Sequence, residues 1–586
     1  MTRKAFSCNP GYCLAALLSL AAPALALAQA SLPQPTIHGR EAAPRQTMRA
    51  YFDDVRKARA IAHSRFETLA SEYELGYVIV QLNEQEASEL RAMGFRLVPD
   101  PHWMTQQLEQ ARKESEARAR ASQATATGIP NYSCYPTVEE VFTEAEGMAA
   151  NKPQLASWID IGDSWAKGAG QGGYDLRVLK LTNSAVSGDK PKLFINAGIH
   201  AREYTTTPLV LEFARKLYNG HGVDADATWI LDHHEVHLLL ATNPDGRKKA
   251  ESGILWRKNT NTAYCGATSN YRGADLNRNF GFTWNISNGG GSSGNACSET
   301  YRGPSAASEP ETRAVEAYIR SLWPDRRGPN RTDPAPLDTS GIHLDIHSHG
   351  RLLLWPWGSN GAPAGNDTQL ATLGRKFAYW NRHTPQRSLD LYETDGTSDG
   401  PSYGELGVAS FTFELGTAFF QQCSYYNSTV LPDNMPALMY AAKVVRTPYQ
   451  TPAGPDVTAL ALNYKRVPQG RPATLVARVD DTRYNQTNGT EPTQTIAAAE
   501  AYIDVPPWLS GARAIPLSAR DGSFDANNEY VVGQIDTTGL SVGQHLVYVR
   551  GQDAAGNWGA FSALFMQVDA PNRTALTSPQ KEAQRR

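Results

Sequence analysis

Two residues that lie three apart in one stretch of the chain could hold a metal ion. The stretch 192–217, KLFINAGIHAREYTTTPLVLEFARKL, carries His200 and Glu203 between a short apolar run and a segment with helical apolar periodicity. At this spacing within one turn, an imidazole and a carboxylate can point at the same place, and Zn²⁺ takes nitrogen and oxygen ligands at about 2.0–2.2 Å. A histidine–glutamate salt bridge has the same spacing, so a metal site requires further ligands.

A third ligand is expected at the end of another strand, because a catalytic zinc site has three protein ligands and one open position. In the segment GIHLDIHSH, the two-residue period of a strand puts four side chains on one face: His343, Asp345, His347 and His349. We choose His347, at the strand terminus, and interpret His343 and Asp345 as structural. Three other histidines compete as ligands but have no acidic partner at a fitting spacing: His233, His234 and His237.

Six separated motifs then follow one another along the chain. They are His200-Ala-Arg-Glu203, Asn243-Pro-Asp-Gly246, Leu255-Trp-Arg-Lys258, Asp275-Leu-Asn-Arg-Asn279, Ile346-His-Ser348 and Phe411-Thr-Phe-Glu-Leu415. In this series the sequence resembles the zinc metallocarboxypeptidases of the carboxypeptidase A/B type, including their bacterial secreted members. The resemblance covers about residues 129–446. It implies one zinc ion per catalytic domain and hydrolysis of the C-terminal bond of peptides and proteins that have a free C-terminus.

The resemblance assigns metal binding and proton transfer to particular residues. It implies one open position for water and three zinc ligands, which are His200, Glu203 and His347. Glu414 matches the general base, which takes a proton from the water that zinc activates and passes it to the leaving amine. Arg257 matches the arginine that stabilises the oxyanion, and Asp275 matches the acid that orients the first zinc histidine.

The resemblance also assigns substrate recognition. Asn277 and Arg278 match the pair that grips the terminal carboxylate of the substrate, a task that suits a planar guanidinium because it binds carboxylate bidentately. Tyr392 matches the mobile tyrosine that closes over this carboxylate, and Arg202 matches a subsite arginine. Asp399 lies at the position that sets side-chain preference, and an acid there implies a basic or dual preference.

The chain departs from the family pattern beside two of these residues. Gly400 and Pro401 stand where many relatives have Asp-Trp, and His349 replaces the usual aromatic residue after the His-Ser pair. These departures leave open how the floor of the specificity pocket and the neighbouring subsite are built. The sequence therefore does not decide between a basic and a dual preference.

Three other functions fit parts of the same pattern. A cell-wall amidopeptidase of the same fold, which cuts γ-D-glutamyl–diaminopimelate bonds, would keep the zinc, whereas Asn277, Arg278 and Tyr392 favour a substrate with a free α-carboxylate. An amidohydrolase that uses His347 and His349 as a His-x-His pair would need an eightfold βα repeat, which the sequence lacks. A secreted peptide- or glycan-binding protein with an inactive domain would usually have lost a ligand or the base, and none is lost here.

Alternating strands and helices are expected to position these residues. Between about residues 129 and 446, the pattern predicts an α/β domain with a mixed, mostly parallel sheet and helices on both faces. We expect strands at residues 174–181, 193–197, 235–241, 341–347, 352–355 and 410–415. We expect helices at residues 137–149, 206–217, 310–322, 370–382 and 434–445.

The first 128 residues are predicted to be a targeting segment and a precursor segment. A basic start, an apolar run that ends at Leu27 and small-x-small sites predict a secretory signal peptide over residues 1–28 and a secreted or periplasmic protein. Residues 29–128 are predicted to be a small α+β unit followed by an exposed, protease-sensitive connector, either a pro-segment or an ordinary N-terminal domain on a linker. The resemblance implies a pro-segment that covers the cleft, with release near Arg118 to Gly128. Its expected elements are a charged helical stretch from residue 47, a strand at 77–82, a helix at 84–93, a strand at 95–98 and a polar helix at 106–122.

The sequence pattern changes after residue 446. A Pro-rich linker at residues 447–455 is followed by short alternating strands and turns, which predict an Ig-like β-sandwich over residues 456–569. The sequence reveals no ligand for this domain, and residues 570–586 are predicted to be a disordered tail. No stretch after the signal reaches about 18 apolar residues, so no membrane span is expected. The net charge of -3 gives no electrostatic footprint for nucleic acid.

The cysteines fit an exported protein. Cys8 and Cys13 belong to the predicted signal, which leaves four: Cys134, Cys265, Cys297 and Cys423. Four cysteines in an exported protein predict two disulfides with three possible pairings. We pair Cys265 with Cys297, because they bracket one Gly/Ser/Asn-rich loop, and Cys134 with Cys423 as the remainder. The alternative is four buried free thiols.

Overall fold

The structure is a computed structural model that describes residues 45–62, 66–122 and 127–571, all within one compact unit over residues 35–586. The predicted signal peptide and nearly all of the predicted C-terminal tail lie outside the described residues. Among the described helices, none has both the length and the apolarity that crossing a membrane requires.

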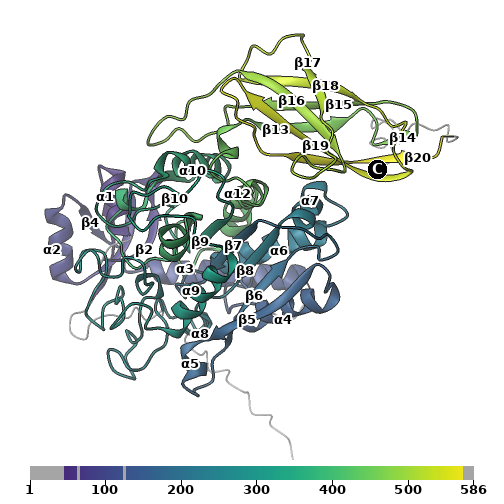
Figure 1. The fold of residues 1–586 in the computed structure, drawn as a ribbon. Coiled ribbons are helices and arrows are strands. Elements are labelled where there is room, and N and C mark those ends of the chain that lie inside the picture. The colour runs from purple at the N-terminus through teal and green to yellow at the C-terminus, as the bar shows by residue number, and fades with distance from the viewer. Residues whose placement is uncertain (1–44, 63–65, 123–126, 572–586) are drawn as a thin grey trace, which may run out of the picture. The chain divides into compact units, whose positions relative to one another are not determined.

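A mixed eight-stranded sheet forms the centre of the molecule, which confirms the predicted α/β architecture (Figure 1). The strand order is β11-β10-β12-β9-β7-β8-β6-β5, and β12, β9, β7 and β8 run parallel to one another. The strands are β5 Ala156–Asp163, β6 Asp175–Leu181, β7 Lys192–Ala197, β8 Glu235–Leu239, β9 Ile342–Ser348, β10 Leu352–Trp355, β11 Thr384–Arg387 and β12 Ala409–Leu415. The sequence missed β5 and β11, which are the two edges of the sheet. Edge strands are short or half-exposed and therefore carry a weak apolar pattern.

Helices cover both faces of this sheet. One buried cluster joins the sheet to α4, α6, α7, α10 and α12, and a second joins the opposite face to α9. The helices are α4 Val138–Asn151, α6 Thr206–Gly220, α7 Ala225–His233, α8 Pro244–Glu251, α9 Pro310–Leu322, α10 Asp367–Asn381 and α12 Leu431–Val444. α4 begins at a capping box in which the Thr137 side chain accepts from the Glu140 amide and the Glu140 side chain accepts from the Thr137 amide. The sequence did not anticipate α7 and α8.

Both predicted disulfides are present, Cys134–Cys423 and Cys265–Cys297. The first joins residues 289 positions apart, the segment before α4 and the start of α11 (Cys423–Tyr425). The second lies between α8 and α9 and closes one loop of the α/β domain. The alternative of four free thiols is therefore wrong.

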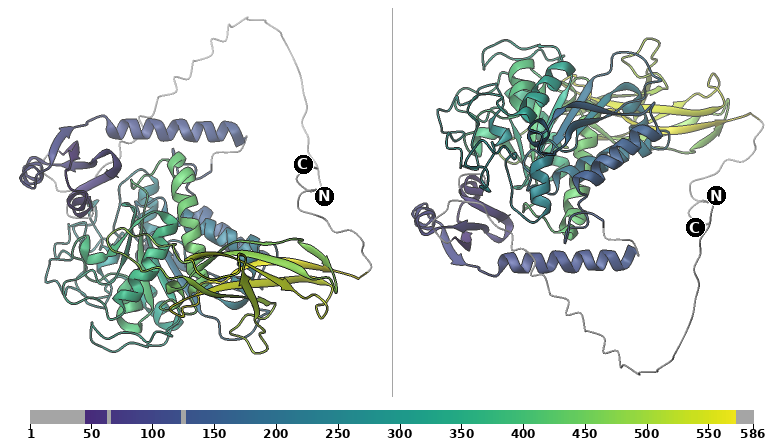
Figure 2. Two further views of the ribbon diagram at one scale, coloured as in Figure 1. Left: turned by 90° about the horizontal axis from the view of Figure 1, so that it is seen from above. Right: turned by 90° about the horizontal axis from the view of Figure 1, so that it is seen from below.

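The N-terminal segment contains more strand than the sequence indicated. It forms a four-stranded sheet of order β2-β3-β1-β4, followed by the long helix α3 that Figure 2 shows. Its elements are β1 Gln46–Tyr51, α1 Val55–Ala62, β2 Glu67–Glu72, β3 Tyr77–Leu82, α2 Glu84–Ala92, β4 Arg96–Pro99 and α3 Trp103–Ser122. The expected helical stretch before residue 77 is thus two strands around a short helix. β2 is stabilised by long-range pairing, since the amide of Ser71 donates to the carbonyl of Thr417 at 2.6 Å, beyond the reach of a local pattern.

The C-terminal strands form one curled sheet whose two halves enclose a common apolar core, the sandwich-like arrangement that was expected. β17 connects the halves by pairing with both β16 and β18. The strands are β13 Asp456–Leu462, β14 Arg466–Pro468, β15 Ala473–Asp480, β16 Ile496–Ile503, β17 Ile515–Ala519, β18 Asn528–Ile535, β19 Gly543–Asp553 and β20 Ser562–Asp569.

One arginine of α10 fixes a loop of this C-terminal domain. Arg375 donates to the carbonyls of four loop positions at 2.9–3.0 Å, namely Asn485, Thr487, Asn488 and Gly489. In return, the side-chain amide of Asn485 donates to the carbonyls of Ala378 and His383 at 3.2 and 2.9 Å. A guanidinium has five donors in a fixed plane, so it can satisfy several carbonyls that no single other side chain could. The loop of the C-terminal domain is therefore held against α10 by hydrogen bonds in both directions.

We expect Arg375→Met to lower the free energy of unfolding by about 3 kcal/mol, because four part-buried hydrogen bonds from a charged donor are lost while the apolar stem is kept. Scanning calorimetry and denaturant titration would measure the change. Arg382→Met is the control, since this side chain is 74% exposed at the end of the same helix and makes one ion pair at 3.9 Å. Equal stability losses in the two variants would contradict the assignment.

Candidate metal centre and active site

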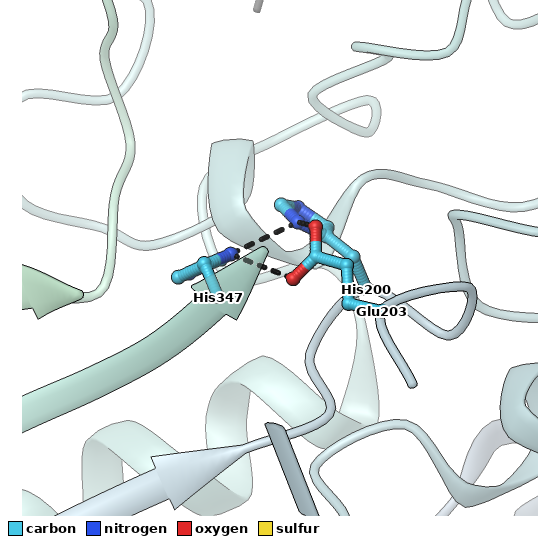
Figure 3. Close-up of side chains that lie close together, drawn as sticks. All are labelled: His200, Glu203 and His347. Carbon is cyan, nitrogen blue, oxygen red and sulfur yellow. Dashed lines mark hydrogen bonds and ion pairs between the residues drawn. The ribbon is translucent and has the colours of Figure 1, made fainter. Parts of the chain in front are cut away.

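The two ends of parallel strands bring the three predicted metal ligands together. β7 and β9 are adjacent and parallel, so the turn after β7, with His200 and Glu203, meets the C-terminal end of β9, where His347 lies (Figure 3). The turn depends on Gly198, which has a φ of +66° and whose place a side chain could take only with strain. The carboxyl ends of parallel strands are where such α/β folds bind ligands.

The ligand atoms converge from all three residues. The Nδ1 atom of His200 lies 2.8 Å from a carboxylate oxygen of Glu203, the Nδ1 atom of His347 lies 3.2 Å from the other oxygen, and the two Nδ1 atoms are 3.1 Å apart. All three side chains are buried. Among the described residues, this is the one group of three or more His, Cys, Asp or Glu side chains close enough to hold a metal ion.

The spacing and the chemistry of this cluster fit zinc. Ligand atoms around a tetrahedral zinc with bonds of about 2.0–2.1 Å lie about 3.3 Å apart, close to the distances seen here. Burial opposes the ionisation of Glu203, but the two imidazoles outweigh it and hold the pKa of this carboxyl well below its usual range. A buried carboxylate facing two imidazole nitrogens is a ready-made site for a divalent cation.

The Nε2 atoms of the two histidines, which face away from the cluster, both contact carboxylates. The Nε2 atom of His200 lies 3.1 Å from Asp275, as the sequence predicted for a residue that orients this histidine. The Nε2 atom of His347 lies 2.9 Å from Asp345, a residue that we had interpreted as structural. The signal was present in the sequence, because strand alternation put Asp345 and His347 on the same face of β9.

Asp275 also holds Arg257. The Nε and Nη2 atoms of Arg257 donate to one oxygen of Asp275 at 3.0 and 2.8 Å. Burial opposes the ionisation of Asp275, but Arg257 and His200 hold its pKa well below its usual range. Asp275 therefore contacts a histidine of the cluster and a cationic side chain at once.

A cavity of about 60 Å³ lies over the cluster and collects most of the predicted site residues. Those that line it are His200, Arg202, Glu203, Arg257, Asn277, Arg278, His347, Tyr392 and Glu414. Arg278 donates to the hydroxyl of Tyr392 at 2.9 Å and to the carbonyl of Gly291 at 3.1 Å, which fixes its guanidinium. Asn277 accepts from the amide of Ser398 at 2.9 Å.

Glu414 lies on β12, the strand next to β9, directly beside His347. β12 and β9 run parallel in a register that pairs these two residues, so the carboxyl of Glu414 enters the same cavity. Burial, with the negative charge of Glu203 adding to it, raises the pKa of Glu414 to about 8, although the imidazole of His347 opposes the shift. A carboxyl with a pKa near neutrality can both accept and return a proton.

Asp399 lies apart from the residues that line the cavity. It is half-buried and accepts a hydrogen bond from the hydroxyl of Thr397. Burial raises the pKa of Asp399, the hydrogen bond from Thr397 opposes this shift, and the positive charge of Arg331 opposes it more weakly. Arg331 itself is held by Ser359, to which it donates at 2.7 Å.

The N-terminal segment reaches the same cavity through β2. Phe66 and Thr68 line the cavity, and Glu67 between them lies 3.1 Å from Arg202. Arg202 also pairs with Glu299 at 3.3 Å, and Glu299 is another cavity residue that the sequence did not single out. No local pattern marks Glu299, because it lies in an irregular loop.

Fold and site together define an α/β protein with a His–Glu–His metal cluster at the strand ends of a mixed sheet. The sequence profile of the zinc carboxypeptidase family matches residues 143–431. The chain belongs to this family. The metal of the family is zinc, and the cluster of His200, Glu203 and His347 is able to bind it.

Individual relatives agree with this assignment. Carboxypeptidase A1 of Sus scrofa is 30% identical over 348 residues, which cover 56% of this chain and 72% of the relative. Carboxypeptidase A2 of Mus musculus is 30% identical over 295 residues, which cover 49% of this chain and 63% of the relative. The chain thus spans about two thirds of the length of these curated relatives.

Two solved structures share the fold. The carboxypeptidase A from Helicoverpa armigera matches with a TM-score of 0.53 at 19% identity, covering 68% of this chain and 96% of that structure. Thrombin activatable fibrinolysis inhibitor matches with a TM-score of 0.52 at 22% identity, covering 69% of this chain and 99% of that structure. At these identities the comparison concerns the fold alone.

Proposed function

We propose that this protein is a secreted zinc carboxypeptidase that hydrolyses the C-terminal bond of peptides with a free α-carboxylate. The observation that carries the proposal is that Arg278 and Tyr392 line the same small cavity as the metal cluster and Glu414. A terminal carboxylate held by Arg278 would leave the last peptide bond of the substrate beside the cluster. Two disulfides and the signal-like N-terminal sequence support secretion.

Each residue has a task that follows from its position. Zinc, when held by His200, Glu203 and His347, supplies a Lewis acid that polarises a carbonyl and makes water more acidic. Arg278 and Asn277 bind the carboxylate, and Tyr392 closes over it. Arg257, fixed by Asp275, offers positive charge to the oxyanion that develops on the attacked carbonyl.

Glu414 carries the proton. Its raised pKa allows the carboxylate to take a proton from the attacking water and, as a carboxylic acid, to donate it to the nitrogen of the leaving amine. The C–N bond breaks as that nitrogen is protonated, so the carboxyl group is ionised again at the end of the reaction.

We expect the zinc-loaded protein, freed of its N-terminal segment, to release single residues from a peptide acid and none from the same peptide as a C-terminal amide. A zinc chelator should abolish the release. Glu414→Gln should lower kcat by about 10²–10⁴-fold because the proton carrier is lost, whereas Glu212→Gln on the surface of α6 should not. Mass spectrometry of the products would measure both.

Equal cleavage of the acid and the amide would contradict the role of Arg278 and Tyr392. If neither peptide is cut, peptides with γ-D-glutamyl–diaminopimelate bonds become the next substrates, and their cleavage would identify an amidopeptidase of the same fold. If these too are untouched, the remaining alternative is an inactive peptide- or glycan-binding protein.

We propose further that Asp399 gives a basic or dual side-chain preference. A half-buried carboxylate favours a C-terminal Lys or Arg, while the hydrogen bond from Thr397 and, more weakly, the positive charge of Arg331 stabilise part of its negative charge inside the protein. This compensation favours a dual preference, in which apolar residues are also removed.

Asp399→Ala should reduce the ratio of kcat/KM for C-terminal Arg over Leu by about tenfold, equivalent to about 1.4 kcal/mol. Arg331→Gln should raise the same ratio, because the carboxylate loses its internal counter-charge. Competition between two peptides that differ only in the last residue would measure the ratios. A ratio that neither substitution changes would refute the role of Asp399.

We also propose that the segment before residue 129 is a pro-segment that blocks the cavity. Its support is the placement of Phe66 and Thr68 in the cavity lining and the ion pair of Glu67 with Arg202, the predicted subsite arginine. The end of α3 and the connector that follows it, near Arg118 to Gly128, are the proposed cleavage region. It includes residues 123–126, which lie outside the described residues.

Removal of the segment through a protease site engineered in the connector should raise kcat/KM by at least about tenfold, because substrate then competes with no covalently attached occupant. Within the uncut precursor, Glu67→Gln should raise activity through the weakened pair, while Glu84→Gln, on the exposed start of α2, should not. A precursor as active as its trimmed form would contradict the proposal.

A further inference from the structure

We propose that Asp345 is a positioning residue that fixes His347 in the orientation needed for metal binding. The proposal rests on the zinc site of the proposed function and adds to it a carboxylate on β9. The side chain of Asp345 is 2% exposed, and one of its oxygens lies 2.9 Å from the Nε2 atom of His347. It therefore touches the ligand on the side away from the metal cluster.

The contact between His347 and Asp345 repeats the contact between the other cluster histidine, His200, and Asp275. The Nδ1 atoms of His200 and His347 both face the cluster, and the Nε2 atoms face Asp275 and Asp345, at 3.1 and 2.9 Å. A carboxylate that accepts the Nε2–H bond keeps the proton on that nitrogen and leaves Nδ1 free as a ligand. The site thus has two histidine–carboxylate pairs rather than one.

Asp345 is the acceptor of this bond. The side-chain nitrogen of Asn277 also lies 3.1 Å from the Nε2 atom of His347. The oxygen of that amide accepts from the amide of Ser398 at 2.9 Å, so its NH₂ group is the part that faces the histidine. An NH₂ group cannot accept a hydrogen bond, which leaves the carboxylate of Asp345 as the partner of Nε2–H.

Three donors meet at Asp345, and only the ionised carboxylate accepts them all. Asn196 donates to one oxygen at 2.7 Å, while the hydroxyl of Ser398 and the Nε2–H of His347 converge on the other. An amide at this position would have one oxygen and one NH₂ group, so it would present a donor to a donor on one side. The contact with Ser398 also joins the zinc ligand to the segment that precedes Asp399.

Because Asn196 contacts Asp345, exchanging the two residue types would move the negative charge from β9 to β7 without removing it. It lies on β7 opposite Asp345, and its own oxygen faces the Nε2 atom of His343 at 2.6 Å. The double variant, which combines Asn196→Asp with Asp345→Asn, keeps one buried carboxylate and one amide in contact. The amide introduced on β9 can donate to the carboxylate introduced on β7 and turn its oxygen to His347. The histidine then retains a hydrogen bond but loses the adjacent negative charge.

The test measures zinc affinity by competition with a chelator, on purified full-length protein and without substrate. Asp345→Asn should weaken zinc binding by about 10–100-fold. The double variant should also bind zinc at least about tenfold more weakly than the parent, although its metal-free form should be as stable as the parent's. Ser398→Ala, which removes a neighbouring donor and leaves the pair with His347 intact, should change the affinity by less than about threefold.

Zinc affinity within about threefold of the parent in a folded Asp345→Asn variant, or in the double variant, would overturn the proposal. If Asp345→Asn does not fold, the double variant decides. An independent measurement uses the parent protein: selective ¹⁵N labelling of histidine should reveal two ring Nε2–H groups at the zinc site with strongly hydrogen-bonded protons, and a single one would refute the assignment. A parent that binds zinc but cuts no peptide would refute the proposed function while leaving this inference standing.

Discussion

The architecture depends on one geometric constraint, that the parallel strands β7, β9 and β12 end at the same edge of the sheet. Each strand carries little chemistry by itself. The edge places the turn with His200 and Glu203, the terminus with His347 and the carboxyl of Glu414 around one point. Rigid strands hold these groups in place before any ligand arrives, which is what a preorganised site requires.

Burying several carboxylates at this edge is electrostatically unfavourable, and the paired cationic and imidazole side chains around them offset that cost. Glu203, Asp275 and Asp345 are all buried near one another, and burying a carboxylate is unfavourable unless it is paired and hydrogen-bonded. Two imidazoles and Arg257 supply the pairing. A divalent cation would supply more, so the site is built for an occupant that helps to stabilise it.

The two flanking regions contact this catalytic core in different ways. The C-terminal domain is joined to it by the charge-assisted hydrogen bonds of Arg375 to a ring of carbonyls, contacts that only a folded loop can offer. The N-terminal segment instead inserts Phe66 and Thr68 beside the metal cluster and pairs Glu67 with Arg202. The first kind of contact stabilises the fold, whereas the second is the one that we propose to compete with a substrate.

The sequence by itself determined the class of fold, the three residues of the cluster that could bind a metal ion and both disulfide pairs. These features depend on local patterns: the spacing of His200 and Glu203 in one turn, the alternation that ends at His347, and cysteines that bracket one loop. The buried strands were also predictable, because strands covered on both faces have continuous apolar runs. The positions of the strands in the central sheet could therefore be predicted from the sequence, except for the edge strands β5 and β11.

Only the tertiary structure decided which polar groups meet. Asp345 and His347 lie two residues apart on one face of β9, but the side-chain amides of Asn196 and Asn277 that contact them come from other segments. The pairing of β2 with the chain near Thr417, and of Arg375 with its four carbonyls, likewise joins residues far apart in sequence. The physical reason is that a hydrogen bond depends on distance and direction between its two atoms, and for distant segments these are set by the packing of the whole fold.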